Sequence, residues 1–231
     1  IRLKMEESPL FKKLKAAGHT SKNPLKESFG HRANLKMVLL ALFGAAMGQG
    51  VVWYTGQFYA QSFMENVCHI GFDQSRTILI WAILFATPFF IVFGSLSDRL
   101  GRKPIMLAGM LLAVFCYRPI YRQMLHTAEV PAVAVTSSMA TDDGRRAIEL
   151  QNGFRYVEKT EAGNTVALEK QLDNGSYLVM VVLVFVQVLL VTVGDGPIAA
   201  FLVELFTTLI RYTSMSLPYH IGNGVFGGLT P

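Results

Sequence analysis

Four polar or aromatic residues lie on one face of an apolar stretch, Met37–Ala60, and could bind a small solute. Gln49, Trp53 and Gln57 are spaced four residues apart, so in a helix they share a face, and Tyr54 lies beside them. Amide groups in an apolar segment need a hydrogen-bond partner, so this face should contact protein or water and not lipid. Either it forms a substrate-binding wall with amide donors and an aromatic platform, or it only makes hydrogen bonds to a neighbouring helix.

Two further residues are candidates for carrying a proton. Asp195 is the single acid well inside the apolar run Tyr177–Phe206, and an ionisable residue in such a run is a functional candidate. Desolvation favours the neutral form of a carboxyl group, which suits a proton site. The alternative is that the helix ends or breaks at Gly194 and leaves Asp195 wet and structural. His220 could shuttle a proton near neutral pH, or could be a hydrogen-bonded packing histidine.

A compact charged stretch, GSLSDRLGRKP at Gly94–Pro104, separates two apolar runs. Gly94 would let two helices approach closely, Gly101 suits a position with positive φ, and Pro104 suits the first turn of the next helix. An ion-pair set here could hold two helices in one arrangement and release them in another. We expect that set to contain Asp98, Arg99, Arg102, Glu204 and Arg211, with a gating role and a static interfacial role equally open.

The elements that position these residues are membrane-spanning helices. Only 16% of the residues are charged, against about 25% in soluble domains, and a span needs roughly 20 apolar residues. The sequence therefore predicts an all-α integral membrane bundle. Tyr177–Phe206 is longer than one span, so it must tilt, protrude or break near Gly194–Pro197. The spans are expected at Met37–Ala60, Thr77–Leu96, Ile105–Tyr121 with an interfacial outer end, and Tyr177–Phe206, with a partial one at Ser214–Pro231.

Charge predicts the orientation of these helices. Residues 1–36 contain nine Lys or Arg and three Glu, whereas Gln61–Ser75 contains no Lys or Arg. Because basic residues favour cytoplasmic loops, residues 1–36 and the 94–104 loop are expected in the cytoplasm, and 122–176 outside. Within that outer loop, alternating residues around Glu161–Asn164 indicate a hairpin, with a disordered loop as the alternative. The net charge of +5 thus belongs to a membrane flank, and no nucleic-acid partner is expected.

Signatures of soluble enzymes are missing from the sequence. It contains no GxxxxGK[ST], HExxH, GxSxG or paired CxxC motif. Cys68 and Cys116 match no metal-binding spacing and are expected as free thiols. We therefore expect no enzyme activity, no metal and no cofactor.

The spacing G-x-L-x-D-R-x-G-R-K-P resembles the cytoplasmic loop motif of the major facilitator superfamily. ESPLFKKLKAAGHTSKNPLKESF and GQGVVWYTGQFYA are similar to the central loop and helix seven of its metabolite:proton symporter family, and GPIAAFLVELF and RYTSMSLPYHIGNGVFGG to helices ten and eleven. The resemblance implies a major-facilitator-type bundle with helices seven to ten and part of eleven. The expected segments are 1–36 (central loop), 37–121 (helices seven to nine), 122–176 (outer insert) and 177–231 (helix ten and partial eleven).

For function, the resemblance implies proton-coupled symport of small polar metabolites, such as carboxylates or betaine-like compounds, across the inner membrane. The proton is the coupling ion, and the partners are the substrate, the lipid bilayer and an N-terminal half outside this sequence, since such transport paths lie between two halves. Asp195, Thr207 and Leu209 depart from the family's helix-ten pattern. These departures leave open a second hypothesis, a non-transporting membrane sensor or scaffold of the same fold.

Overall fold

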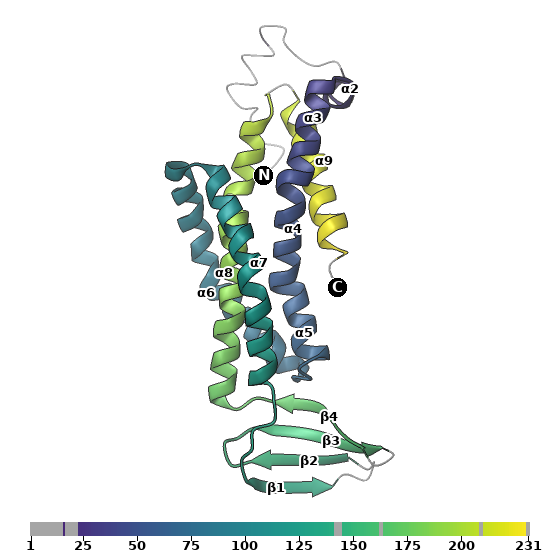
Figure 1. Ribbon diagram of the computed structural model, residues 1–231, viewed down its shortest axis with the longest axis vertical. Coiled ribbons are helices and arrows are strands. Elements are labelled where there is room, and N and C mark those ends of the chain that lie inside the picture. Colours follow the sequence, from purple (N-terminus) through teal and green to yellow (C-terminus); the bar gives the residue numbers. More distant parts are fainter. Residues whose placement is uncertain (1–15, 17–22, 141–144, 162–163, 208–209, 230–231) are drawn as a thin grey trace.

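The computed structural model describes residues 16, 23–140, 145–161, 164–207 and 210–229. Within these ranges, four helical segments are long and apolar enough to cross a membrane. They stand side by side as an upright bundle with a small β-sheet at one end (Figure 1). The expected all-α membrane bundle is therefore confirmed, and the sheet is an addition at its end. The four segments are Arg32–Asn66, Phe72–Leu100, Arg102–Thr127 and Asn174–Leu205.

The first of these segments is a helical column interrupted by two π-helical turns. A short helix, α2 (Pro24–Gly30), precedes it and is capped by the Asn23 side chain, which accepts a hydrogen bond from the Lys26 amide at 3.2 Å. A π-helical turn widens the helix and is often found at functional sites. The column consists of α3 (Arg32–Ala41), a π turn (Leu42–Ala46), α4 (Met47–Tyr54), a second π turn (Thr55–Tyr59) and α5 (Ala60–Asn66).

The remaining helices follow, and the first three of them are longer than the apolar runs that predicted them. They are α6 (Phe72–Leu100), α7 (Arg102–Thr127), α8 (Asn174–Leu205) and α9 (Arg211–Ile221), which continues as a π turn, Gly222–Gly227. Helix α7 extends beyond the predicted Ile105–Tyr121 as far as Thr127, and Tyr121 is partly buried against the bundle. The interfacial position of its outer end stays a prediction.

Helix α8 does not break at Gly194–Pro197. It continues through Pro197 to Leu205, although an internal proline removes one backbone hydrogen bond. Packing explains the continuity, since α8 lies at the centre of the bundle between α6 and α7. A Cβ on Gly196 would lie only 3.2 Å from the Gly94 nitrogen and 3.3 Å from the Phe90 carbonyl oxygen of α6. The backbones of α6 and α8 are thus held close together at this level.

The connection from α6 to α7 is a single residue, Gly101. Its φ is 96°, a region that residues with a Cβ avoid, and its amide donates to the Ser97 carbonyl at 3.0 Å. Pro104 lies in the first turn of α7, where its missing N–H leaves no gap in the hydrogen bonding. The predicted roles of Gly101 and Pro104 in the turn are confirmed.

The segment between α7 and α8 folds as a four-stranded antiparallel sheet, β1 (Val135–Ala140), β2 (Arg145–Leu150), β3 (Arg155–Glu161) and β4 (Asn164–Gln171). Glu161 pairs with Asn164, so the predicted hairpin is confirmed, and the alternative of a disordered loop does not hold for these strands. The turn residues 162–163 lie outside the described residues. Strand β4 lies next to the helices and β1 is the far edge (Figure 1).

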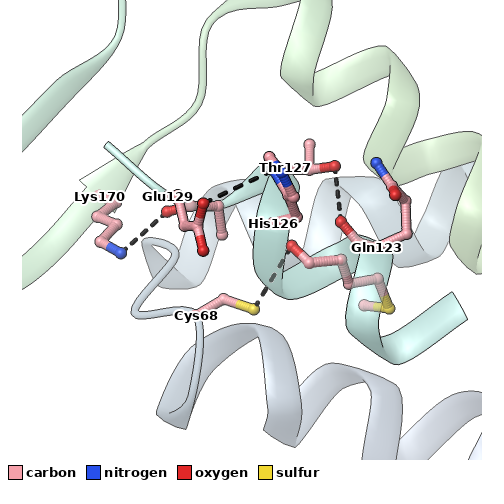
Figure 2. A network of polar contacts seen from close by, with 8 residues as sticks. Cys68, Gln123, His126, Thr127, Glu129 and Lys170 are labelled. Atoms are coloured by element: carbon pink, nitrogen blue, oxygen red, sulfur yellow. Dashed lines mark hydrogen bonds and ion pairs between the residues drawn. The ribbon is translucent and has the colours of Figure 1, made fainter. Parts of the chain in front are cut away.

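Side chains and backbone groups join the sheet to the helix ends. The Lys170 Nζ of β4 donates to the Ala128 carbonyl at the end of α7 at 2.9 Å (Figure 2). The Gln74 amide of α6 makes two hydrogen bonds, of 3.0 and 2.8 Å, with the Leu172 backbone. Cys68 is buried beside this junction, and desolvation raises the pKa of its thiol to about 11, with the Lys170 charge opposing the rise. The sheet is therefore fixed to the bundle.

Candidate functional site

The central feature of the site is a hydrogen bond between Gln49 of α4 and Asp195 of α8, 146 residues apart in the sequence. The Gln49 Nε2 donates to the Asp195 Oδ1, and Gln49 is only 3% exposed. A predicted substrate-binding residue and a predicted proton-coupling residue are thus in direct contact. Because α8 does not end at Gly194, Asp195 is held inside a helix against a buried amide, rather than left wet at a helix break.

The Gln49 side chain has a second polar atom that this hydrogen bond does not satisfy. Among the described residues, the Gln49 Oε1 is buried without a hydrogen-bond partner. An unpaired buried acceptor costs free energy, so the Gln49 oxygen is a position where a donor from a solute or a protonated carboxyl group would be stabilising.

An aromatic cluster lies one turn further along the same helix. The Trp53 ring lies 5.2 Å from the Tyr54 ring and 5.3 Å from Phe58, and Tyr54 lies 5.1 Å from Phe58, measured between ring centroids. All of these arrangements are tilted or edge-to-face, the geometry that aromatic quadrupoles favour. Two of the four predicted substrate-face residues therefore form an aromatic platform, to which Phe58 is an addition.

The remaining predicted substrate residue, Gln57, is less closely joined to the others. It lies within the π turn Thr55–Tyr59, where more residues per turn change the face on which each side chain lies. The rule that residues four positions apart share a helix face therefore applies to Gln49 and Trp53, but not to Gln57. Gln57 is half-buried, and its side chain makes no hydrogen bond within the described ranges.

Two tyrosines that the sequence did not single out support this helix. The Tyr117 hydroxyl of α7 donates to the Val52 carbonyl at 2.9 Å, and Tyr121 donates to the Thr55 carbonyl at 2.5 Å. Backbone carbonyls at irregular turns inside a membrane need such partners. The two tyrosines are four residues apart and so share one face of α7, and this spacing is the signal that could have identified them.

Close packing between α7, α8 and the π turn fixes the same region. A Cβ on Gly56 would lie 2.8 Å from the Tyr117 hydroxyl and 2.7 Å from Val191 of α8. No side chain larger than hydrogen fits there without displacement of its neighbours. The candidate substrate face is thus held by α7 and α8 together, the same two helices that carry Tyr117 and Asp195.

The predicted proton carrier His220 lies apart from the Gln49–Asp195 pair. It is exposed on α9 and packs edge-to-face on Tyr219, with ring centroids 5.9 Å apart. Neighbouring Asn223 donates to the Tyr219 carbonyl at 3.0 Å. Within the described residues, the structure gives His220 no direct bond to Asp195.

The charged turn at the other end of the bundle forms part of the predicted ion-pair set. Arg102 contacts Asp98 at 3.1 Å, one helical turn away, and Glu204 of α8 at 2.8 Å. The two carboxylates are 61% and 60% exposed, whereas Arg102 is 21% exposed. One guanidinium therefore links the turn between α6 and α7 to the end of α8.

Two other residues predicted for this set, and the glycine predicted for close helix approach, do not behave as expected. Arg99 has no ion pair among the described residues, and the Arg211 Nε donates instead to the Phe206 carbonyl at 3.1 Å. Arg211 is drawn away because α9 begins at that residue, close to the exposed end of α8. Gly94 does lie at the contact of α6 with α8, but a Cβ there would meet only the Gly196 oxygen, at 4.0 Å. Gly196, not Gly94, is the tight position.

The described residues contain no group of three or more His, Cys, Asp or Glu that could hold a metal ion. The polar contacts of the site are instead a carboxyl–amide pair, aromatic rings and tyrosine hydroxyls. Such groups can bind and orient a small solute and exchange a proton.

The four membrane-length apolar helices of the described residues, with a short charged turn between two of them, are typical of a multi-pass membrane protein. Residues 2–140 match the model of the family described as sugar (and other) transporters. The chain belongs to that family, within the major facilitator superfamily, as its motifs indicated.

Individual relatives agree with this family. The whole chain aligns at 18% identity with a "Putative proline/betaine transporter" of Staphylococcus aureus (strain COL), and at 20% with the "Inner membrane metabolite transport protein YhjE" of Escherichia coli (strain K12). The chain spans 39% of the length of the first relative and 42% of the second. No solved structure gives a significant match.

Proposed function

We propose that this chain forms part of a proton-coupled symporter for small polar metabolites, with carboxylates or betaine-like compounds as the substrate class. The observation that carries the proposal is the hydrogen bond between Gln49 and Asp195. It joins the candidate substrate face of α4 to the acid of α8 within apolar helices. Protonation of that acid and occupation of that face would therefore affect each other directly.

An amide is a suitable partner for a carboxyl group that gains and loses a proton. An ionised carboxylate accepts only, whereas a protonated one also donates, and the amide of glutamine offers both a donor and an acceptor. In the present arrangement the Gln49 Nε2 donates to Asp195 and the Gln49 Oε1 has no partner in the described structure. A proton arriving at Asp195 would give the carboxyl group a donor for that oxygen.

The aromatic platform supports the betaine-like part of the substrate class. The faces of Trp and Tyr rings attract quaternary ammonium groups, and Trp53 and Tyr54 lie one turn from Gln49. Two relatives are named as a proline/betaine transporter and a metabolite transport protein. These names support small polar compounds as the substrate class. In this proposal the substrate cation contacts the rings, and polar groups near Gln49 contact the remainder.

Transport would proceed by alternating access, with two helix bundles rocking around a midplane site. The second bundle is the N-terminal half expected outside this sequence, since relatives are more than twice as long as the aligned chain. The Asp98–Arg102–Glu204 contacts would stabilise one of the two end states. The protein would lie in the inner membrane, with residues 1–36 on the cytoplasmic side and the proton as coupling ion.

The test is uptake by the complete protein in sealed vesicles, using a panel of labelled organic acids and betaines with and without a protonophore. Accumulation that collapses with the protonophore supports proton symport and identifies the substrate class. No uptake of any compound by correctly inserted protein would overturn the proposal in favour of a non-transporting sensor or scaffold. Uptake that is insensitive to the protonophore would retain transport but remove proton coupling.

A further inference from the structure

A groove lies between the first helical column, α7 and α8, at the end of the bundle that carries the charged turn. It consists of an apolar cavity of about 150 Å³ and a second cavity of about 400 Å³, called here the polar part because charged residues contribute to its lining. The two share Lys103 and Phe201 in their linings, so they form one continuous depression. Its polar end lies beside Arg102 and Glu204, and its apolar end lies against Leu40 and Gly44.

The apolar part is an open slot, not a packing defect. Met106 and Ala45 form a buried floor, at 3% and 5% exposure, while Leu40 and Leu107 are 54% and 61% exposed along the rim. A Cβ on Gly44 would have no atom within 4 Å. In a bilayer, such a slot faces hydrocarbon, so its width and lining suit an alkyl chain.

The polar part contains a lysine, Lys103, that is not bound by either nearby carboxylate. Both nearby carboxylates, Asp98 and Glu204, are bound by Arg102, whereas Lys103 is exposed and has no ion pair within the described residues. Lys36 precedes Leu40 by four residues on α3 and so lies on the same face, one turn further toward this end. Lys103 also lies in the first turn of α7, where free backbone amides add a favourable field for an anion.

We propose that this groove binds an anionic phospholipid, with its phosphate at Lys103 and one acyl chain in the slot between Leu40 and Leu107. Basic pockets between transmembrane helices hold anionic head groups in this way. Charge complementarity selects an anion at the polar end, and the adjoining apolar slot, lined by Leu40, Met106 and Leu107, selects a chain of methylene groups. A small anion would satisfy only the first of these. A zwitterionic lipid would satisfy the second but the first only weakly, because its ammonium group offsets the charge of its phosphate. The proposal does not depend on the transported substrate.

Bound lipid would act on the charged turn directly. Lys103 follows Arg102, the residue that joins α7 to Glu204 of α8. A phosphate at Lys103 would attract Arg102 as well, and so compete with Asp98 and Glu204 for its guanidinium. The lipid would thereby influence the contact between α7 and α8 at this end.

The experiment measures lipid retained by the complete purified protein, using mass spectrometry after titration with dioleoylphosphatidylglycerol or dioleoylphosphatidylcholine. We expect preferential retention of phosphatidylglycerol. Lys103→Gln should weaken that retention about fivefold and leave phosphatidylcholine unchanged. Lys103 is exposed, so the substitution tests binding and not folding.

A second variant tests the slot. Gly44→Leu should fill it and lower phosphatidylglycerol retention at least as strongly as Lys103→Gln. The matched control is Gly224→Leu, because a Cβ there likewise has no atom within 4 Å and Gly224 lies on the π turn after α9. That control should retain phosphatidylglycerol as the unmodified protein does.

Equal retention of the two lipids by the unmodified protein would overturn the proposal. So would unchanged phosphatidylglycerol retention in either Lys103→Gln or Gly44→Leu. Displacement of the lipid by millimolar glycerol 1-phosphate would also overturn it, because it would assign the site to a free phosphate and give the slot no part. The absence of displacement, together with losses in both variants, supports the lipid.

Discussion

The bundle contains two polar constellations that differ in their contact with water. Gln49 and Asp195 meet in its interior, where Gln49 is 3% exposed, whereas Asp98 and Glu204 contact Arg102 at the end of the bundle and are about 60% exposed. An interaction in an apolar interior is strong and costly to leave half-made, while exposed ion pairs contribute little. The interior pair is therefore suited to coupling substrate and proton, and the exposed set to an easily reversible contact between helices.

The largest expected effect is that of Asp195→Asn. An asparagine can still bond Gln49 but cannot take up a proton, so accumulation driven by the proton gradient should fall by about hundredfold or more, while exchange of substrate across the vesicle membrane continues. This magnitude corresponds to the loss of a proton-transfer group. Vesicle uptake and counterflow of the same labelled substrate measure the two activities.

The matched control is Asp73→Asn, since Asp73 is an exposed acid in the first turn of α6. It should leave both activities unchanged. Undiminished accumulation by Asp195→Asn would show that the interior pair takes no part in proton coupling. The two constellations would then not differ in function as proposed.

A second prediction concerns the tyrosines that hold the interior site. Tyr117→Phe and Tyr121→Phe each remove a donor from a backbone carbonyl of α4 or its π turn, and each should lower stability by about 1–3 kcal/mol. Thermal unfolding in detergent compares them with Tyr212→Phe, which alters a hydroxyl on a 75% exposed side chain. If the three variants unfold together, the hydroxyl contacts do not stabilise the interior region.

A third prediction separates two glycines at the contact of α6 with α8. Gly196→Ala places a methyl group 3.2 Å from the Gly94 nitrogen, whereas Gly94→Ala meets only one atom, at 4.0 Å. The first should cost about 1–3 kcal/mol through overpacking, and the second should be neutral or slightly stabilising through helix propensity. Thermal unfolding of the two variants checks the order, and the reverse order would place the tight contact elsewhere.

The smallest effect on stability is expected at the exposed set. Arg102→Gln breaks both ion pairs but should change the free energy of unfolding by about 1 kcal/mol or less. Its transport rate should nevertheless fall severalfold, because one end state loses its contact. Asp98→Asn, which removes one of the two pairs, should have a weaker effect on rate and insert normally. A large loss of stability in Arg102→Gln, or normal transport by both variants, would contradict a gating role.

The membrane helices could be predicted because the length of an apolar run is a local property of the sequence. Gly101 was also predictable, since a glycine between two apolar runs signals a turn. Strands β1 and β2 (Val135–Ala140 and Arg145–Leu150) were not predicted. They are stabilised by pairing with neighbouring strands, and the pattern of residues within each strand does not reveal that pairing.

The site was predictable in its residues but not in its geometry. Gln49 and Asp195 were each singled out by polarity within an apolar run, yet nothing local indicates that two residues 146 positions apart form a bond. The π turn at Thr55–Tyr59 changes the face of Gln57 and leaves no mark in the residue pattern. Arg211 was misplaced because the start of α9, not its charge, decides which group it contacts.

The central claim is that Gln49 and Asp195 act as one unit on the substrate, and a double-mutant cycle tests it most directly. Substrate affinity would be measured by counterflow for Gln49→Leu, Asp195→Leu and the double variant, since leucine at either position cannot form the hydrogen bond. Direct contact predicts an interaction free energy of about 1 kcal/mol or more between the two substitutions. Effects that add to within about 0.5 kcal/mol would show two independent residues and contradict the account.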